Sequence, residues 1–178
     1  MKTIKSFILS LLLISVGELS AQQITTAELQ VNGLTCSMCS QATEKSLKTL
    51  DFVESVKPDL NKNIFVINFK KEKSVNIDLI RKKVQDAGFS VGNLTATFHF
   101  NNIKVDENGQ AKVGSSFFKV LNAKNKTLNG SVRATVVDKN FIPGSVFKQK
   151  ATQFKTESYA SGYGVVEGKK TRIYHITI

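Results

Sequence analysis

Cysteine is scarce in this 178-residue chain, and so are long apolar runs, tryptophan and proline. With two cysteines, Cys36 and Cys39, the chain cannot build a framework of several disulfides. The same count excludes a tetrahedral zinc site with four cysteine ligands from one molecule. No segment after residue 21 approaches the ~20 apolar residues that a membrane-spanning helix needs. The mature chain is therefore predicted not to span a membrane.

The first 21 residues have the pattern of a secretory signal peptide. Lys2 and Lys5 give a charged start, the range from Phe7 to Val16 is apolar, and Leu19-Ser20-Ala21 resembles a small-residue cleavage site. The mature protein is expected to start near Gln22 and to be exported, either periplasmic or secreted. Export also means that a cysteine pair meets an oxidising compartment and must be kept reduced, or loaded with metal, to act as a ligand pair.

Charge divides the mature chain into two predicted domains. Residues 22–100 carry 10 Lys and Arg against 8 Asp and Glu, whereas residues 101–178 carry 13 against 5. The excess positive charge thus belongs to the second half. Because the protein is expected to be exported, nucleic acid is not the expected partner for this positive charge. The charge fits an anionic envelope surface or an acidic protein, or else a solvated lysine-rich surface.

Residues 22–100 show the order strand, helix, strand, strand, helix, strand. Strands are expected at residues 24–31, 52–58, 64–69 and 89–100. The first helix starts near Ser37 and is expected to bury the face that contains Cys39, Ala42, Leu47 and Leu50. Asn76 caps the second helix, whose apolar positions recur at helical spacing until Gly88 ends it. This order predicts an α+β fold with a ferredoxin-like βαββαβ domain, in which both helices cover one face of an antiparallel sheet.

Residues 101–178 are predicted to form a second, small β-rich domain. Its short β-rich runs are SFFKVLNA, GSVRATVVD, SYASGYGVV and TRIYHITI. Their spacing favours a small antiparallel barrel or sandwich, and an OB-like barrel is one form it can take. A short helical turn is expected within FIPGSVFKQKATQF.

The two cysteines form a Cys-x-x-Cys sequence at the start of the first predicted helix. Two intervening residues allow both sulfurs to converge on one ion from a loop and a helical turn. The N-terminus of a helix favours the thiolate form of a nearby cysteine. Thiolates are soft ligands for Cu(I), Zn(II) and other thiophilic ions. Two sulfurs suit Cu(I) best, because this ion accepts low coordination.

Two segments resemble the heavy-metal-associated domain family. GLTCSMC, between a first strand and a helix, resembles the family's GMTCxxC loop. IRKKVQDAGF resembles its second helix, which ends in an AGY or AGF corner. The resemblance covers roughly residues 24–98 and implies that Cys36 and Cys39 are metal ligands. It also implies transfer of the ion by docking with a protein metal donor or acceptor and exchanging thiolates.

The chain departs from the family pattern at two positions. Leu34 stands where the family has Met, and leucine can fill the space under the loop at small cost. Phe89 stands where the family has Tyr or Lys, and it can shield the site without hydrogen bonding to a thiolate. Three further residues are weighed as ligands: Met38, His99 and His175. The intervening position of Met38 is expected to face solvent, and both histidines are expected to be hydrogen-bonded sheet residues.

Three alternatives to metal binding stay open. A thiol–disulfide oxidoreductase also places Cys-x-x-Cys at a helix start. The chain has no tryptophan before its first cysteine, however, and Pro58 and Pro143 are its only prolines. A structural disulfide across so short a loop would add little stability. A domain that has lost metal binding could act as an adaptor, although both cysteines are intact.

The sequence as a whole predicts an exported, two-domain, non-enzymatic protein that binds a soft metal. Cys36 and Cys39 are the predicted ligands, Cu(I) is the favoured ion, and Zn(II) and Hg(II) are alternatives. The protein would transfer or buffer the ion, with mercury scavenging as a related role. The sequence leaves the oligomeric state and the function of residues 101–178 open.

Overall fold

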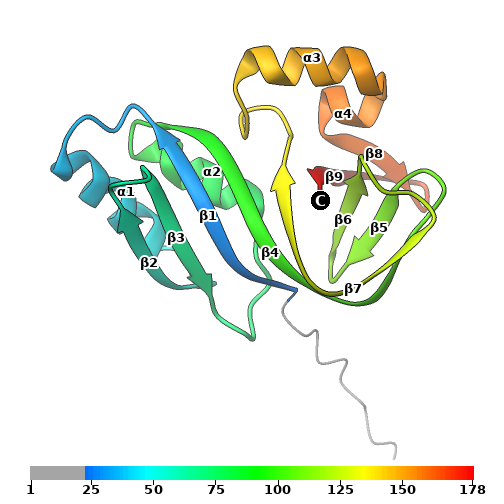
Figure 1. Cartoon of the computed structure of the whole chain (residues 1–178), viewed down its shortest axis with the longest axis horizontal. Coiled ribbons are helices and arrows are strands. Elements are labelled where there is room, and N and C mark those ends of the chain that lie inside the picture. Colours follow the sequence, from blue (N-terminus) through cyan, green and yellow to red (C-terminus); the bar gives the residue numbers. More distant parts are fainter. Residues whose placement is uncertain (1–22) are drawn as a thin grey trace, which may run out of the picture.

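The first half of the protein has the predicted order of elements. The computed structural model describes residues 23–178, and the predicted signal peptide, residues 1–21, lies outside the described residues. The six elements are β1 (Ile24–Asn32), α1 (Ser37–Lys48), β2 (Val53–Asp59), β3 (Ile64–Phe69), α2 (Ile77–Asp86) and β4 (Ser90–Val105). The strands pair antiparallel in the order β2-β3-β1-β4, and α1 and α2 pack against each other and against this sheet (Figure 1). The α+β, ferredoxin-like prediction is confirmed for this half.

Local sequence signals predict the position of α2, and the helix lies there in the structure. The side-chain oxygen of Asn76 accepts a hydrogen bond from the backbone N–H of Leu79 at 3.1 Å, which caps the first turn. Ile77, Ile80 and Val84 are buried along one stripe, as their spacing predicts. Gly88 follows with a φ of 89°, a left-handed conformation that suits glycine at the end of a helix.

The buried face of α1 matches the predicted face at Leu47 and Leu50 and differs from it at Cys39 and Ala42. Ala42 is exposed and Cys39 is half-buried, whereas Ser40 and Thr43 are buried together with Leu47. The Thr43 hydroxyl donates to the Cys39 carbonyl at 3.1 Å, so its burial leaves no unsatisfied donor. The face is rotated because this local hydrogen bond makes a threonine acceptable in the core. Hydrophobicity alone does not reveal that possibility.

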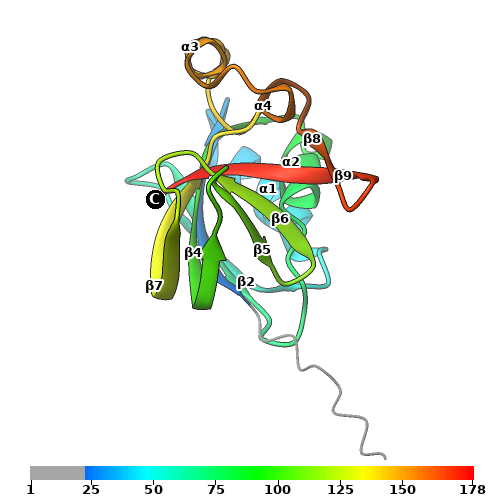
Figure 2. The same ribbon diagram turned by 90° about the vertical axis from the view of Figure 1, so that its right-hand side faces the viewer.

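The second half continues the same sheet. Its elements are β5 (Gln110–Val113), β6 (Ser116–Val120), β7 (Lys126–Val136), α3 (Gly144–Phe154), α4 (Glu157–Ser161), β8 (Tyr163–Val166) and β9 (Lys169–Thr177). The complete path is β2-β3-β1-β4-β7-β9-β6-β5, with β8 paired to β9. Figure 2 shows β4, β5, β6, β7 and β9 curving around one end of the molecule. The predicted boundary between residues 100 and 101 falls inside β4, so the two halves share a strand.

Three features of the second half differ from the prediction. β6 and β9 run parallel, whereas an all-antiparallel arrangement was expected. The expected helical turn is the 11-residue helix α3. The run SYASGYGVV, expected as a strand, forms α4 before β8 begins. The connection that contains α3 and α4 joins the antiparallel neighbours β7 and β9, and β9 lies between β7 and β6 in the sheet. This placement of β9 beside a strand far away in the sequence leaves no local sequence pattern.

Two ion pairs connect the halves. Arg133 on β7 forms a bidentate pair with Glu28 on β1, at 2.8 and 3.0 Å, across the exposed face of β4. Arg172 on β9 contacts Asp78 on α2 at 2.8 Å and the buried Asp138 at 2.8 Å. Burial acts to lower the pKa of Arg172, but the hydrogen bonds and charges of the two aspartates outweigh it and raise that pKa. Arg172 therefore stays charged between two acids from opposite halves.

Loss of the Arg172 side chain is expected to destabilise the protein strongly. Arg172→Met leaves the Asp138 carboxylate buried without its cation, so the free energy of unfolding should fall by about 2–4 kcal/mol. Urea unfolding followed by far-UV circular dichroism measures this change. Arg133→Met is the matched control, because that ion pair is solvent-exposed and its loss should leave the unfolding curve unchanged. Equal effects of the two substitutions would contradict this account.

A single unfolding transition is also expected, because one hydrophobic core spans both halves. Phe98 on β4 is fully buried, stacks on Phe100 and meets the edge of Phe118 on β6. Phe98→Ala should lower the free energy of unfolding by about 3–5 kcal/mol and shift the transition of both halves together. Leu60→Ala, at an exposed position, is the control. Two separate transitions in amide hydrogen exchange would show that the halves unfold independently.

Candidate metal centre

Cys36 and Cys39 lie in the loop after β1 and at the start of α1, as predicted. Cys36 is the N-cap residue of α1, and its sulfur accepts a hydrogen bond from the backbone N–H of Cys39 at 3.2 Å. The Cys36 carbonyl accepts the N–H of Ser40 at 3.2 Å, which closes the first helical turn. The helix N-terminus therefore directs partial positive charge at the sulfur of Cys36.

The two sulfurs are close and accessible. The Cα atoms of Cys36 and Cys39 are 5.3 Å apart, and the structure joins the pair by a disulfide. Cys36 is exposed and Cys39 is half-buried. The side chains thus meet at the surface, where another protein can reach them. In the disulfide form the sulfurs are not thiolates, so metal ligation requires the reduced form.

Three residues support the loop from below. Gly33 has a φ of 92°, and a Cβ at this position would lie 3.5 Å from the ring of Phe89. Leu34 and Phe89 are both partly buried and pack against the main core. Leu34 therefore fills the space under the loop that the sequence assigns to it. Phe89, in the segment between α2 and β4, lies beside Gly33 and adds an apolar ring to this support.

The donor set around the cysteines is small. Met38 is 77% exposed. Within residues 23–178, no group of three or more His, Cys, Asp and Glu side chains converges. His99 is exposed on β4, with one ring nitrogen 3.4 Å from the Ser131 hydroxyl. His175 is fully buried on β9 and uses both ring nitrogens elsewhere. Two sulfurs without a nearby imidazole or carboxylate fit an ion that accepts two-coordination.

A second polar cluster, which the sequence did not reveal, surrounds His175. Its Nδ1 lies 2.7 Å from a carboxylate oxygen of Asp138, and its Nε2 lies 3.2 Å from the Ser158 hydroxyl. The backbone N–H of His175 donates to the same carboxylate, and Arg172 donates to its other oxygen. The Tyr159 ring packs edge-on against the imidazole, and burial and the charge of Asp138 raise the pKa of Tyr159 to about 12.

This cluster has the hydrogen-bond connectivity of a catalytic Ser-His-Asp triad, but it lacks the accessible cavity that such a triad needs. A pocket of about 200 Å³ lies beside it, yet Ser158 and His175 do not line that pocket. The imidazole is fully buried, and Asp138 is committed to Arg172 as well. A nucleophile needs a cavity in which a substrate can reach it. The cluster instead satisfies the buried polar groups that connect α2, α4 and β9.

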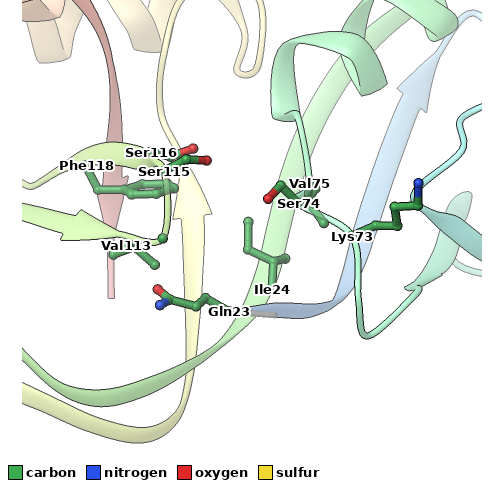
Figure 3. Close-up of a pocket in the computed structure, with 10 residues that line it drawn as sticks. Gln23, Ile24, Lys73, Ser74, Val75, Val113, Ser115, Ser116 and Phe118 are labelled. Carbon is green, nitrogen blue, oxygen red and sulfur yellow. The ribbon is translucent and has the colours of Figure 1, made fainter. Parts of the chain in front are cut away.

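Another pocket lies between the two halves (Figure 3). It is formed by the start of β1, the segment before α2 and the β5–β6 turn, and its volume is only about 40 Å³. Ser74, Ser115 and Ser116 contribute hydroxyls, and Lys73 is its one charged residue. Its lining has no histidine, cysteine or carboxylate, so it provides neither a metal site nor an acid–base pair.

Comparison with known proteins places the cysteine loop in a family. Residues 28–90 match the heavy-metal-associated domain. The copper chaperone CopZ of Staphylococcus haemolyticus is 30% identical over 63 residues, which cover 35% of this chain and 91% of the chaperone. A protein of Arabidopsis thaliana named "Probable copper-transporting ATPase HMA5" is 38% identical over 66 residues. That match covers 37% of this chain but only 6% of the length of the Arabidopsis protein.

Among solved structures, the yeast copper transporter domain Ccc2a is 29% identical, with a TM-score of 0.33 over 36% of this chain and 88% of that domain. All three matches stop short of half of this chain. Through its first half, which carries both cysteines, the chain belongs to the heavy-metal-associated domain family.

Proposed function

We propose that this protein binds one Cu(I) ion through the thiolates of Cys36 and Cys39 and passes it to, or buffers it for, a partner protein. The observation that carries the proposal is the cysteine pair at the start of α1 in a heavy-metal-associated domain, with Cys36 exposed and Cys39 half-buried. Copper is named for both curated relatives, the chaperone and the transporting ATPase. The two-sulfur donor set supports Cu(I) over Zn(II), which favours four ligands.

Ion transfer follows from the openness of the site. A two-coordinate ion held at the surface can accept an incoming thiolate before one of its own ligands leaves. Exposure of Cys36 and Met38 leaves this approach unobstructed by side chains. The proposed partner is thus a protein with a thiolate site of its own. We propose no catalytic role for the chain, and the pattern of residues 1–21 supports export of the mature protein.

For the second half we propose an OB-like barrel. Its strands β4, β5, β6, β7 and β9 form a curved sheet in which β5 returns close to β4, and β6 and β9 are parallel neighbours. A five-stranded, partly open barrel with such crossing connections is the architecture of OB-folds. Such a barrel would localise the metal-binding half or select its partner.

A thiol–disulfide oxidoreductase is the second candidate, because the structure pairs Cys36 with Cys39 in a disulfide. An accessible disulfide at a helix start is the form that such an enzyme exchanges with its substrates. In the reductive direction, the reduced cysteine pair would give two electrons to a substrate disulfide, which becomes a dithiol, and the Cys36–Cys39 disulfide that forms would be reduced again by an added dithiol.

Cu(I) affinity should depend on both cysteines. Titration of the reduced protein against a chromophoric Cu(I) competitor should give one ion per chain. Cys36→Ser/Cys39→Ser should weaken binding by more than about 100-fold, since loss of second-shell groups alone costs a metal site 10–100-fold. Met38→Leu is the matched control, because it changes the remaining sulfur of the loop and should leave the affinity unchanged.

Equally weak binding by the unmodified protein and the double variant would refute the proposal. Parallel titrations with Zn(II) and Hg(II) identify the preferred ion.

Oxidation should abolish binding, because the disulfide removes both thiolates. The air-oxidised protein is expected to leave the Cu(I) competitor complex intact, and reduction followed by removal of the reductant should restore one-to-one binding. The same samples test the second candidate in a disulfide-reductase assay with insulin. Turnover that exceeds that of the double-serine variant, together with unchanged Cu(I) affinity after oxidation, would favour the oxidoreductase.

A further inference from the structure

A pocket of about 220 Å³ lies in the C-terminal half and is not part of the cysteine site. Its walls come from three separate segments of the chain. Asn108 belongs to the β4–β5 turn, Lys119 lies on β6 and Lys124 follows β6. Phe154 ends α3, and Thr156 stands between α3 and α4. Such convergence of loops from distant parts of the chain is typical of a ligand site.

The charge that lines this pocket is positive. Lys119 is half-buried and Lys124 is exposed, and neither ammonium has a carboxylate partner within residues 23–178. No Asp or Glu lines the pocket. Two ammonium groups without carboxylate partners at one pocket give it a positive potential. A bound anion would pair with both lysines.

Two uncharged groups in the pocket add directional and apolar contacts. The Thr156 hydroxyl oxygen is buried and has no hydrogen-bond partner among the described residues. Thr156 is the N-cap residue of α4, yet its side chain makes no capping hydrogen bond. The Phe154 ring is held by the Tyr159 ring at 5.7 Å and by the Lys150 ammonium at 5.8 Å. A fixed aromatic ring gives a small ligand an apolar wall to pack against.

The position of the pocket agrees with the proposed OB-like barrel. In OB-folds the second and third strands and the loops between strands 1–2 and 4–5 bind oligonucleotides and oligosaccharides. Here Lys119 lies on the third strand of the barrel, β6. Asn108 lies in the β4–β5 turn, and Thr156 lies in the connection between β7 and β9. The pocket thus occupies the corresponding place, although its side-chain chemistry stands without that comparison.

We propose that this pocket binds an anionic saccharide. Its carboxylate or phosphate group contacts the Lys119 and Lys124 ammonium groups, and its ring packs against Phe154. Asn108 and Thr156 supply the hydrogen-bonding groups for the sugar hydroxyls. A saccharide fits better than a nucleic acid, because single strands bind along rows of aromatic rings on which successive bases stack. This pocket offers one ring and space for one sugar unit.

The test is a titration of the ¹⁵N-labelled protein followed by amide chemical shifts. The probes are glucuronic acid, glucose 6-phosphate, glucose, inorganic phosphate and an oligothymidine. At least one anionic sugar should shift the amides of residues 108, 119, 124, 154 and 156 saturably. Glucose and inorganic phosphate should each bind about tenfold more weakly, because each lacks one of the two recognised parts. Preference for glucuronic acid assigns a carboxylate ligand, and preference for glucose 6-phosphate assigns a phosphate.

Lys119→Gln/Lys124→Gln should weaken the binding of the preferred sugar by about tenfold or more. Lys104→Gln/Lys169→Gln is the matched control, because it removes two exposed lysines of the same half that do not line the pocket. An equal loss of affinity in both variants would show that the effect comes from the overall charge of the protein, and it would overturn the proposal. Absence of saturable shifts, equal binding of inorganic phosphate, or tighter binding of oligothymidine would overturn it as well. None of these outcomes depends on whether the cysteine pair binds copper.

Discussion

The pairing of β4 on both of its edges is the constraint on which the rest of the structure depends. Residues 95–98 pair with β1 on one edge and with β7 on the other. Ala96 and Phe98 point into the shared core, while Thr95 and Thr97 are half-buried on the other side of the sheet. Backbone N–H and C=O groups of β4 are therefore hydrogen-bonded to one strand from each half of the chain. Separation of the halves would expose both a hydrogen-bonded ladder and the rings around Phe98.

This shared strand gives the cysteine loop a fixed setting. The loop follows β1, whose neighbours β3 and β4 set its position, and α2 supports it through Phe89. Arg172 fastens α2 to β9 through Asp78, so the second half of the chain also restrains α2. The backbone around the cysteine pair is therefore anchored by strand pairing and by the contact with Phe89. That setting agrees with the proposed release of the ion to a partner protein.

Local sequence signals were sufficient to predict the first half. Asn76, the apolar spacing after it and Gly88 define α2 within one segment, and Cys-x-x-Cys at a helix start defines the candidate site. The side chains that join the halves could not be predicted in this way. Asp78 and Arg172 are 94 residues apart, and no period or motif relates them. The parallel pairing of β6 with β9 likewise joins segments that are far apart in the sequence, and Thr43 is buried with its hydroxyl bonded to the Cys39 carbonyl.

X-ray absorption at the copper K-edge of the Cu(I)-loaded, reduced protein tests the central claim most directly. The account predicts a first coordination shell of two sulfur atoms, with no nitrogen or oxygen ligand, and the loss of this shell in Cys36→Ser/Cys39→Ser. A shell dominated by nitrogen or oxygen, or one that persists in the double variant, would show that copper is held elsewhere and would contradict the assignment of Cys36 and Cys39.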